Sequence, residues 1–238
     1  MSDLLNSASL VMIPSGYAED KVYSVVPSDG SGDLSFTRAS NGTRVNSAGV
    51  VEVAPWNLAD DSNGFGGLSA ITKTTGQVSP IDSTSGNLLT ATGSGEHYSG
   101  TLALTAVVGN SYTYSAYGKF VQGVNIALRT VFSNGFEDIS TIWNLSTGAL
   151  VLNATNHTNP TITAVGNGYY RVSITYTPST VPAFPLLFRL QMAVGTNLGF
   201  TASSGDGFLA YGAQINNGAL KPYFPTTDRL NVPRLTYQ

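Results

Sequence analysis

The sequence predicts an all-β fold, and three observations support the prediction. Apolar and polar residues alternate over short runs, as in strands with one buried face; the clearest runs are residues 112–119, 124–132, 170–176, 184–194 and 208–215. Turn-forming Gly, Asn and Ser residues separate these runs at regular intervals. No stretch between them is long enough and periodic enough for a helix. Together these features predict a β-sandwich.

The composition favours a packed, nearly neutral domain. Charged residues make up 11% of the 238 residues and hydrophobic residues 42%, whereas ordinary soluble domains carry roughly 25% charged residues. The net charge of −3 and the scattered basic residues argue against a nucleic-acid partner. Absence of cysteine excludes a disulfide framework and thiolate chemistry. No apolar run reaches the ~20 residues of a membrane span, and no secretory signal is evident, so we expect a soluble protein made in a cytosol.

The first 54 residues predict a small β unit. We expect strands over residues 10–13 and 22–26, a polar turn over 14–20 between them, a loop over 28–33 and a strand over 34–38. Residues 43–53 read as a hairpin, with Gly49 where a left-handed residue suits its loop. Such a unit is too thin to bury its own faces, and therefore needs a partner surface.

The remainder predicts the sandwich itself. Residues 55–95 are rich in Gly, Ser and Thr and suggest loops anchored by Trp56, with one strand over 86–91. Further strands are expected over 102–108 and in a hairpin over 142–152 with its turn at 146–148. In the final strand, simple alternation assigns Leu209, Tyr211, Ala213 and Ile215 to one face and Phe208, Ala210, Gly212 and Gln214 to the other.

Catalytic chemistry finds little support. Glu96 and His97 could form an acid/base couple, but a solvated loop pair is favoured, and His157 also lies in an expected loop. The acidic pairs 60–61 and 137–138 are adjacent in sequence, so their side chains point to opposite faces of a strand and form no glycosidase pair. We therefore expect no enzyme.

Asp206 is the one candidate metal ligand. It lies between two glycines before the final strand, where it could supply one oxygen to a structural calcium ion. The alternative, which we favour, is a turn aspartate, because turn chemistry alone places Asp beside Gly. No other cofactor is expected.

Alternate positions along the central strands carry polar side chains, and this pattern predicts a ligand-binding face. Aromatic, arginine and amide side chains on one sheet face suit sugar recognition, and the candidates are Tyr117, Arg129, Tyr169, Arg171, Arg189 and Gln214. An ordinary solvated or subunit-facing surface is the alternative. The opposite parity is expected to be core, with Tyr112, Tyr114, Tyr176 and Phe188, while Trp143 could lie on either side.

The two ends of the chain carry a resemblance. The runs FTRAS at residues 36–40, TRVNSAG at 43–49 and NVPRLTY at 231–237 look like segments of virion proteins from tailed bacteriophages, including head fibres, spikes and tail-associated proteins. Between them, GNSYTYSAYGK, WNLSTGALV, VGNGYYRVSITYT and GAQINNG with PYFPTTDR resemble phage carbohydrate-binding-like jelly rolls.

The resemblance implies a jelly roll over residues 55–227, inserted into a β scaffold of residues 1–54 completed by 228–238, with Ala54 near Asn231. It also implies a structural protein of the virion (head fibre, capsid decoration or tail-associated), with other virion proteins as partners and a homo-oligomer, by analogy a trimer. The alternative is a glycan-binding adhesion module for a host receptor or mucus. A polysaccharide-degrading enzyme is the third and weakest hypothesis.

Overall fold

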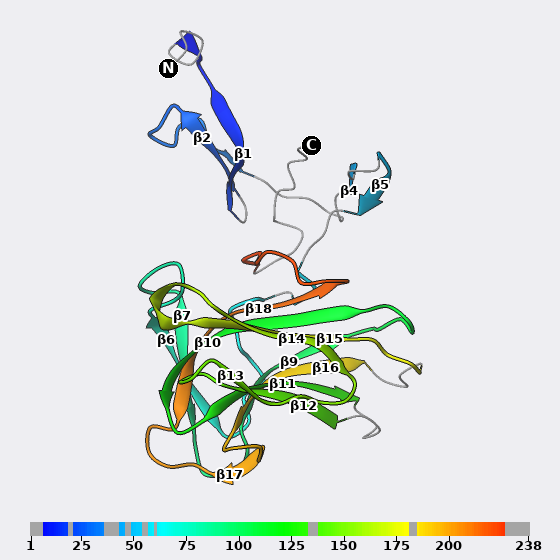
Figure 1. Ribbon diagram of the computed structural model, residues 1–238. Coiled ribbons are helices and arrows are strands. Elements are labelled where there is room, and N and C mark those ends of the chain that lie inside the picture. Colours follow the sequence, from blue (N-terminus) through cyan, green and yellow to red (C-terminus); the bar gives the residue numbers. More distant parts are fainter. Residues whose placement is uncertain are drawn as a thin grey trace. The chain divides into compact units, whose positions relative to one another are not determined.

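A computed structural model describes residues 7–18, 21–35, 43–45, 49–53, 57–59, 61–132, 138–180 and 185–226 (Figure 1). Their regular structure consists of strands and the short 3-10 helix η1 (Gly166–Gly168), which confirms the all-β class. None of the helices in these ranges is long and apolar enough to cross a membrane. The chain divides into two units, Met1–Asp60 with Pro225–Gln238, and Asp61–Phe224. The expected boundaries at 54/55 and 227/228, and the proximity of Ala54 and Asn231, fall on residues outside the described ranges and stay predictions.

The first unit contains two small antiparallel sheets. β1 (Val11–Ala18), β2 (Lys21–Val26) and β3 (Leu34–Ser35) form one, in that order, and β4 (Thr43–Val45) and β5 (Val51–Val53) form the other. The second sheet confirms the predicted hairpin. The turn predicted from residue 14 is wrong, because β1 continues to Ala18. Pro14 is tolerated there since β1 is an edge strand whose register shifts between Met12 and Tyr17.

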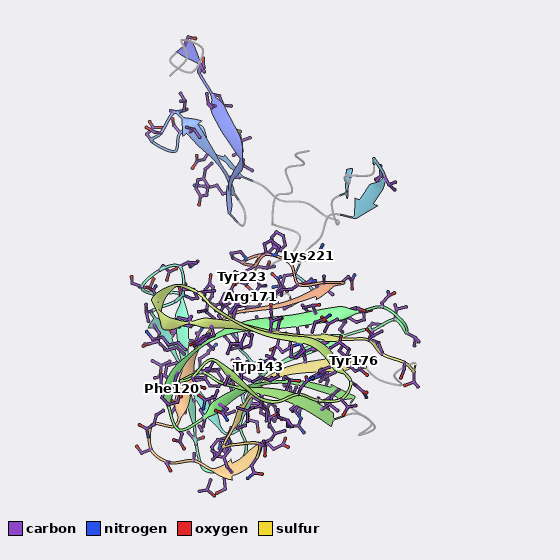
Figure 2. The ribbon with its side chains drawn as sticks, in the orientation of Figure 1. Phe120, Trp143, Arg171, Tyr176, Lys221 and Tyr223 are labelled. Atoms are coloured by element: carbon purple, nitrogen blue, oxygen red, sulfur yellow. The ribbon has the colours of Figure 1, made fainter. Side chains whose placement is uncertain are left out.

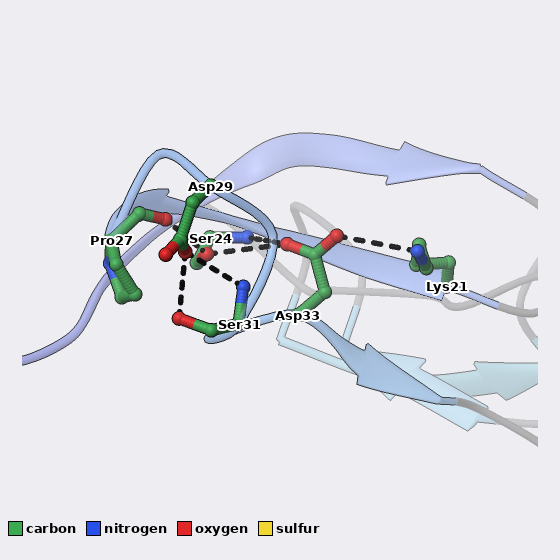
Figure 3. Close-up of polar contacts among 6 residues, drawn as sticks. All are labelled: Lys21, Ser24, Pro27, Asp29, Ser31 and Asp33. Carbon is green, nitrogen blue, oxygen red and sulfur yellow. Dashed lines mark hydrogen bonds and ion pairs between the residues drawn. The ribbon is translucent and has the colours of Figure 1, made fainter.

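The loop between β2 and β3 is organised by Asp33 (Figure 3). Its carboxylate accepts a hydrogen bond from the Ser24 amide at 2.8 Å and pairs with the Lys21 ammonium at 3.3 Å. A Cβ on Gly32 would lie 2.7 Å from Cδ of Pro27, so only glycine fits at this position. The sequence DGSGD therefore closes a specific turn.

The second unit is a sandwich of two antiparallel sheets. The larger sheet has the order β14-β15-β10-β18-β7-β6 and the smaller sheet the order β13-β12-β11-β16-β9. The strands of the larger sheet are β6 (Ile71–Gln77), β7 (Gly86–Ala91), β10 (Tyr112–Gln122), β14 (His157–Ala164), β15 (Tyr170–Tyr176) and β18 (Gly207–Asn217). Those of the smaller sheet are β9 (Tyr98–Leu104), β11 (Asn125–Phe132), β12 (Asp138–Asn144), β13 (Ala149–Leu152) and β16 (Leu186–Ala193). A separate ribbon pairs β8 (Ser94–Glu96) with β17 (Gly199–Thr201).

The strand order is that of a jelly roll. In the larger sheet β7, β18, β10 and β15 are successive neighbours, and in the smaller sheet β9, β16, β11 and β12 are. Early strands therefore pair with late ones, as two interlocked Greek keys require. Figure 1 shows the layer of β10, β14 and β15 above the layer of β9, β11 and β12.

The core lies between the two sheets. Tyr114 of the larger sheet meets Phe188 of the smaller sheet with ring centroids 5.4 Å apart, and both side chains are fully buried. Tyr112 and Tyr176 are buried as predicted, and Trp143 also belongs to the core (Figure 2). The core parity read from the sequence is thus confirmed for these strands.

β18 departs from the simple alternation predicted for it. Tyr211 pairs with Tyr117 and Gln214 with Ser115, so two residues of β18 lie opposite Ala116 alone. Gly212, at φ +61°, forms this bulge. Leu209 and Tyr211 consequently lie on the outer face, whereas Ala213 and Ile215 point into the core; the prediction that they share one face is wrong.

Two further predictions along the chain need correction. Residues 71–77 and 94–96 form strands rather than loops; β6 is an edge strand in which only Ile71 is buried, so it shows no alternation. The strand predicted at 102–108 is β9, which begins at Tyr98 and ends at Leu104, because Val107 and Val108 lie exposed beyond it.

Trp56, the expected anchor, lies outside the described residues. The hairpin of β12 and β13 is confirmed, with the side chain of Asn144 accepting hydrogen bonds within its turn.

Candidate functional site

Four of the six predicted ligand residues come together on the outer face of the larger sheet. Tyr117 and Arg171 pair across β10 and β15, and the Arg171 guanidinium lies over the Tyr117 ring, 5.3 Å from its centroid. Gln214 on β18 and Tyr169, just before β15, belong to the same face. Tyr169 donates its hydroxyl hydrogen to the Val78 carbonyl at 2.6 Å. These four residues therefore lie on one face of the larger sheet.

This face is covered by the chain's own exit segment, residues 219–224. Arg171 donates from Nη2 to the Lys221 carbonyl at 2.9 Å, and Gln214 donates to the Pro222 carbonyl at 3.1 Å. The Phe224 amide donates back to Oε1 of Gln214 at 2.8 Å. Figure 2 shows Arg171, Lys221 and Tyr223 close together. Burial lowers the pKa of Arg171, which is the expected result of partial removal from water.

An aromatic cluster completes the cover. The Tyr223 ring lies 5.5 Å from the Tyr117 ring and 5.3 Å from the Tyr211 ring, and its hydroxyl shares a 2.9 Å hydrogen bond with Ser62. Burial raises the pKa of Tyr223. A Cβ on Gly212 would lie 2.9 Å from Tyr223, so the bulge glycine also lets the rings approach. Of the side chains predicted to meet a sugar, Tyr117, Arg171 and Gln214 instead hold the exit segment against the sheet.

Arg129 and Arg189 lie on the smaller sheet, so the prediction of one shared face is wrong. They are directly paired across β11 and β16, whereas Tyr117 and Arg171 belong to β10 and β15. Parity along a strand specifies which residues share a face of that strand, but it does not specify which sheet the strand joins.

Around this pair lies a polar group that we call the arginine face: Glu96, Tyr98, Arg129, Ser140, Arg189 and Gln191. Arg129 Nη1 donates to the Glu96 carboxylate at 2.8 Å and to Oε1 of Gln191 at 2.9 Å. The guanidinium of Arg189 stacks on the ring of Tyr98, with its central carbon 4.2 Å from the ring centroid. Gln191 pairs with Tyr98, and Ser140 pairs with Arg129.

The arginine face holds donors that have no acceptor among the described residues. Nε of Arg189, Nε2 of Gln191 and Oγ of Ser140 are buried, and each lacks a hydrogen-bond partner among the described residues. A buried polar atom without a partner costs roughly 1–3 kcal/mol, so such groups are expected to be used. Tyr98 and Arg189 are half-buried and Glu96 is exposed, so these three residues of the arginine face reach solvent.

Sequence reasoning missed most of this group. Gln191 was assigned the same parity as Arg189, two residues away on β16, and that spacing was a usable signal. Tyr98 lies between the loop-rich stretch 55–95 and the strand predicted at 102–108, and its role depends on β9 beginning four residues earlier than expected. Ser140 lies on β12 and carries no sequence signal, because a serine in a strand is common.

Neither histidine lies in a solvated loop. His97 is fully buried and stacks on Phe200 with centroids 4.2 Å apart, so the predicted Glu96–His97 pairing is wrong in both its acid/base and its solvated form. His157 joins the two sheets: its Nε2 lies 2.9 Å from the Thr130 hydroxyl and its Nδ1 lies 2.8 Å from the Thr141 hydroxyl. Burial lowers the pKa of His157 to about 4, so the ring is neutral at pH 7.

Asp206 has the geometry of a turn residue. Its Oδ2 accepts a hydrogen bond from the Ser203 amide at 2.8 Å, and its own amide donates to the Ser203 carbonyl at 3.1 Å. Within the described part of the chain, no three acidic, histidine or cysteine residues cluster as metal ligands. The turn accounts for Asp206 without an ion, and the structural calcium stays a prediction.

Comparison with known proteins adds a limited likeness. No protein-family model matches the chain, and no curated protein sequence does. One similar solved structure holds the CBM22-1–GH10 modules of xylanase 10B from Clostridium thermocellum with xylohexaose, at 14% identity and TM-score 0.37; the match covers 71% of this chain and 29% of that chain. Another is described as a carbohydrate-binding module from the β-sandwich superfamily, at 10% identity and TM-score 0.34, covering 88% of this chain and 86% of that one. Likeness at this level assigns no ligand to the present chain.

Proposed function

We propose that the second unit is a non-catalytic glycan-binding module and that the arginine face is its binding site. The observation that carries the proposal is the set of buried donors on Arg189, Gln191 and Ser140 that find no partner in the described part of the chain and lie beside the half-buried ring of Tyr98. Sugar hydroxyl and ring oxygens are acceptors for such donors, and an aromatic ring supplies an apolar contact for the sugar.

The composition of the same face favours binding over hydrolysis. Glycosidases use two carboxyl groups, roughly 5–9.5 Å apart, that flank the scissile bond. Of the side chains that the structure describes on the arginine face, Glu96 is the single carboxylate, and it is paired with Arg129 at 2.8 Å. A polysaccharide-degrading enzyme is therefore the weakest of the three functions considered.

The test is a glycan array probed with the purified chain. We expect binding that is lost in a Tyr98→Ala variant, because the ring supplies the apolar contact. Phe120→Ala is the matched control, since Phe120 is an aromatic residue of the larger sheet that is also partly exposed (Figure 2). Thermal melting of both variants checks that they are folded. No binding by the wild-type chain, or equal loss in both variants, would contradict the proposal.

A second role, as a structural component of a tailed-phage virion, is compatible with the first. The runs that resemble virion proteins lie near the two ends of the chain, and both ends belong to one unit, with the sandwich as the other. Such a chain would present the sandwich while the first unit contacts other virion proteins. Immunogold imaging of purified particles would place it on the head or the tail, and unlabelled particles would contradict this role.

A further inference from the structure

We infer that the arginine face takes a sugar residue that carries a carboxylate, such as a uronic or sialic acid. The inference rests on the proposed glycan-binding function and specifies its ligand class. Planar guanidinium groups match carboxylates through paired, charge-assisted hydrogen bonds, and two such groups lie side by side here. A neutral sugar would accept hydrogen bonds from these donors but would leave the positive charge of Arg189 without a negative partner.

Arg189 and Gln191 hold donors that are not used within the described residues. Arg189 makes no ion pair with any side chain that the structure describes; it stacks on Tyr98, and its Nε is buried without an acceptor. Nε2 of Gln191 is also buried without an acceptor in the described ranges, while its Oε1 accepts a hydrogen bond from Arg129. The unused groups are all able to donate, so the missing partner is rich in acceptors.

The register of β11 and β16 brings the charges of the two arginines together. Arg129 and Arg189 are directly opposite each other on neighbouring strands, and like charges in that position are destabilising. Glu96 pairs with Arg129, whose Nη1 donates to its carboxylate, and among the described side chains it makes no ion pair with Arg189. An anion bound at Arg189 would complete the neutralisation of the pair.

The Glu96 carboxylate already pairs with one arginine of this face. Its side chain is 44% exposed, whereas that of Arg129 is 5% exposed, so the carboxylate reaches a buried arginine from the open edge of the face. It shows that this surface accommodates a carboxylate beside an arginine. Glu96 would also repel a second carboxylate on Arg189, and its charge should therefore weaken binding of an acidic ligand relative to that of a neutral one.

The probes are oligogalacturonates and their methyl esters, which share a skeleton and differ in charge, together with sialyllactose and lactose. By titration calorimetry on the full chain we expect an acid to bind roughly 10-fold or more tightly than its neutral counterpart, since hydrogen bonds to charged groups are the stronger ones. Binding of the acid should weaken as salt is added.

Three variants sharpen the test. Arg189→Met should weaken binding of the acid roughly 10- to 100-fold and Arg189→Lys less, because lysine keeps the charge but not the planar fork. Glu96→Gln keeps an acceptor for Arg129 and should strengthen binding of the acid several-fold relative to binding of the neutral probe. Lys119→Met is the control, because it removes one positive charge from the larger sheet and should change nothing.

The outcomes separate the inference from the function beneath it. Neutral probes or neutral array glycans that bind as well as the acids, with binding still lost in Tyr98→Ala, would overturn the inference and leave glycan binding intact. The inference also fails, and glycan binding again stands, if Arg189→Met and Lys119→Met behave alike towards the acids. No binding of any probe or array glycan would overturn both.

Discussion

Tyr117 and Tyr223 meet edge to face, with ring centroids 5.5 Å apart and planes at 75°. One residue lies in the middle of β10 and the other in the segment that leaves β18, so their contact joins the exit of the domain to its centre. The sequence suggested a sugar-binding face here. The structure instead has a small second core on the outer face of the larger sheet.

Tyr117→Ala is therefore expected to destabilise the domain rather than to weaken ligand binding. Loss of a partly buried ring from the cluster should lower the free energy of unfolding by about 2 kcal/mol or more, somewhat below the cost for a fully buried aromatic residue. Urea unfolding measures it. Tyr117→Phe keeps the ring and should remain near wild type, so an alanine variant as stable as the phenylalanine variant would refute the second core.

Gly212→Ala should lower the free energy of unfolding for two reasons, backbone strain and overlap with Tyr223. A comparison with Gly109 separates them. Gly212 has φ +61°, and an added Cβ would lie 2.9 Å from Tyr223; Gly109 has φ +80° with nothing within 4 Å of an added Cβ. Gly109→Ala should therefore cost only the backbone term of roughly 1 kcal/mol. Gly212→Ala should cost roughly 1–3 kcal/mol more from overlap. Equal losses of unfolding free energy would show that the bulge has room.

His157 predicts a fall in stability under mild acid. Burial lowers its folded pKa from 6.5 to about 4, so between these pH values the unfolded chain binds a proton that the folded chain does not. Stability from this group is complete above pH 6.5 and declines as the pH falls to about 4, by roughly 3 kcal/mol at most. Unfolding curves at a series of pH values measure the slope.

The control for this slope is His157→Gln. That variant should be less stable at pH 7, since two threonine hydroxyls lose a ring partner, but its stability should change much less between pH 6.5 and 4. Asp82, whose pKa is lowered to about 2 mainly by hydrogen bonds from Ser85 and Thr84, acts in a lower pH window and does not confuse the comparison. A variant with the same slope as the wild type would assign the effect to another group.

Self-association through the first unit remains a prediction. Val25, Leu34 and Val51 expose 42%, 52% and 66% of their surface, and β1 and β3 are edges of their sheet. Because exposed apolar strands and free edges favour pairing with another chain, we expect the full chain to form a homo-oligomer, by analogy a trimer. Light scattering at micromolar concentration measures the mass. Val51→Lys should shift it towards the monomer, and a wild-type chain that is already monomeric would refute the prediction.

Much of the fold could be predicted from local pattern. Alternation in β10, β15 and β16 identified the strands and their core residues, because a strand with one buried face must alternate whatever its neighbours are. The turn at Asn144 was equally local, since the side chain bonds the backbone two residues on. The edge strand β6 was not predicted, for the converse reason. Only Ile71 of this strand is buried, so its sequence shows no alternation of apolar and polar residues.

The candidate site depended on long-range decisions that the sequence does not carry. Alternation placed Arg129 and Arg189 on polar faces of their strands, and it did the same for Tyr117 and Arg171. Only the pairing of β11 with β16, and of β10 with β15, separated them onto two sheets.

The exit segment then covered one sheet face and left the other accessible, through hydrogen bonds from Arg171 and Gln214 to backbone carbonyls of residues 221 and 222. The sequence by itself thus determined the class of fold and the inward faces of most central strands, because burial selects residue types locally. The tertiary structure decided which polar side chains meet and which stay accessible, because those contacts join positions far apart along the chain.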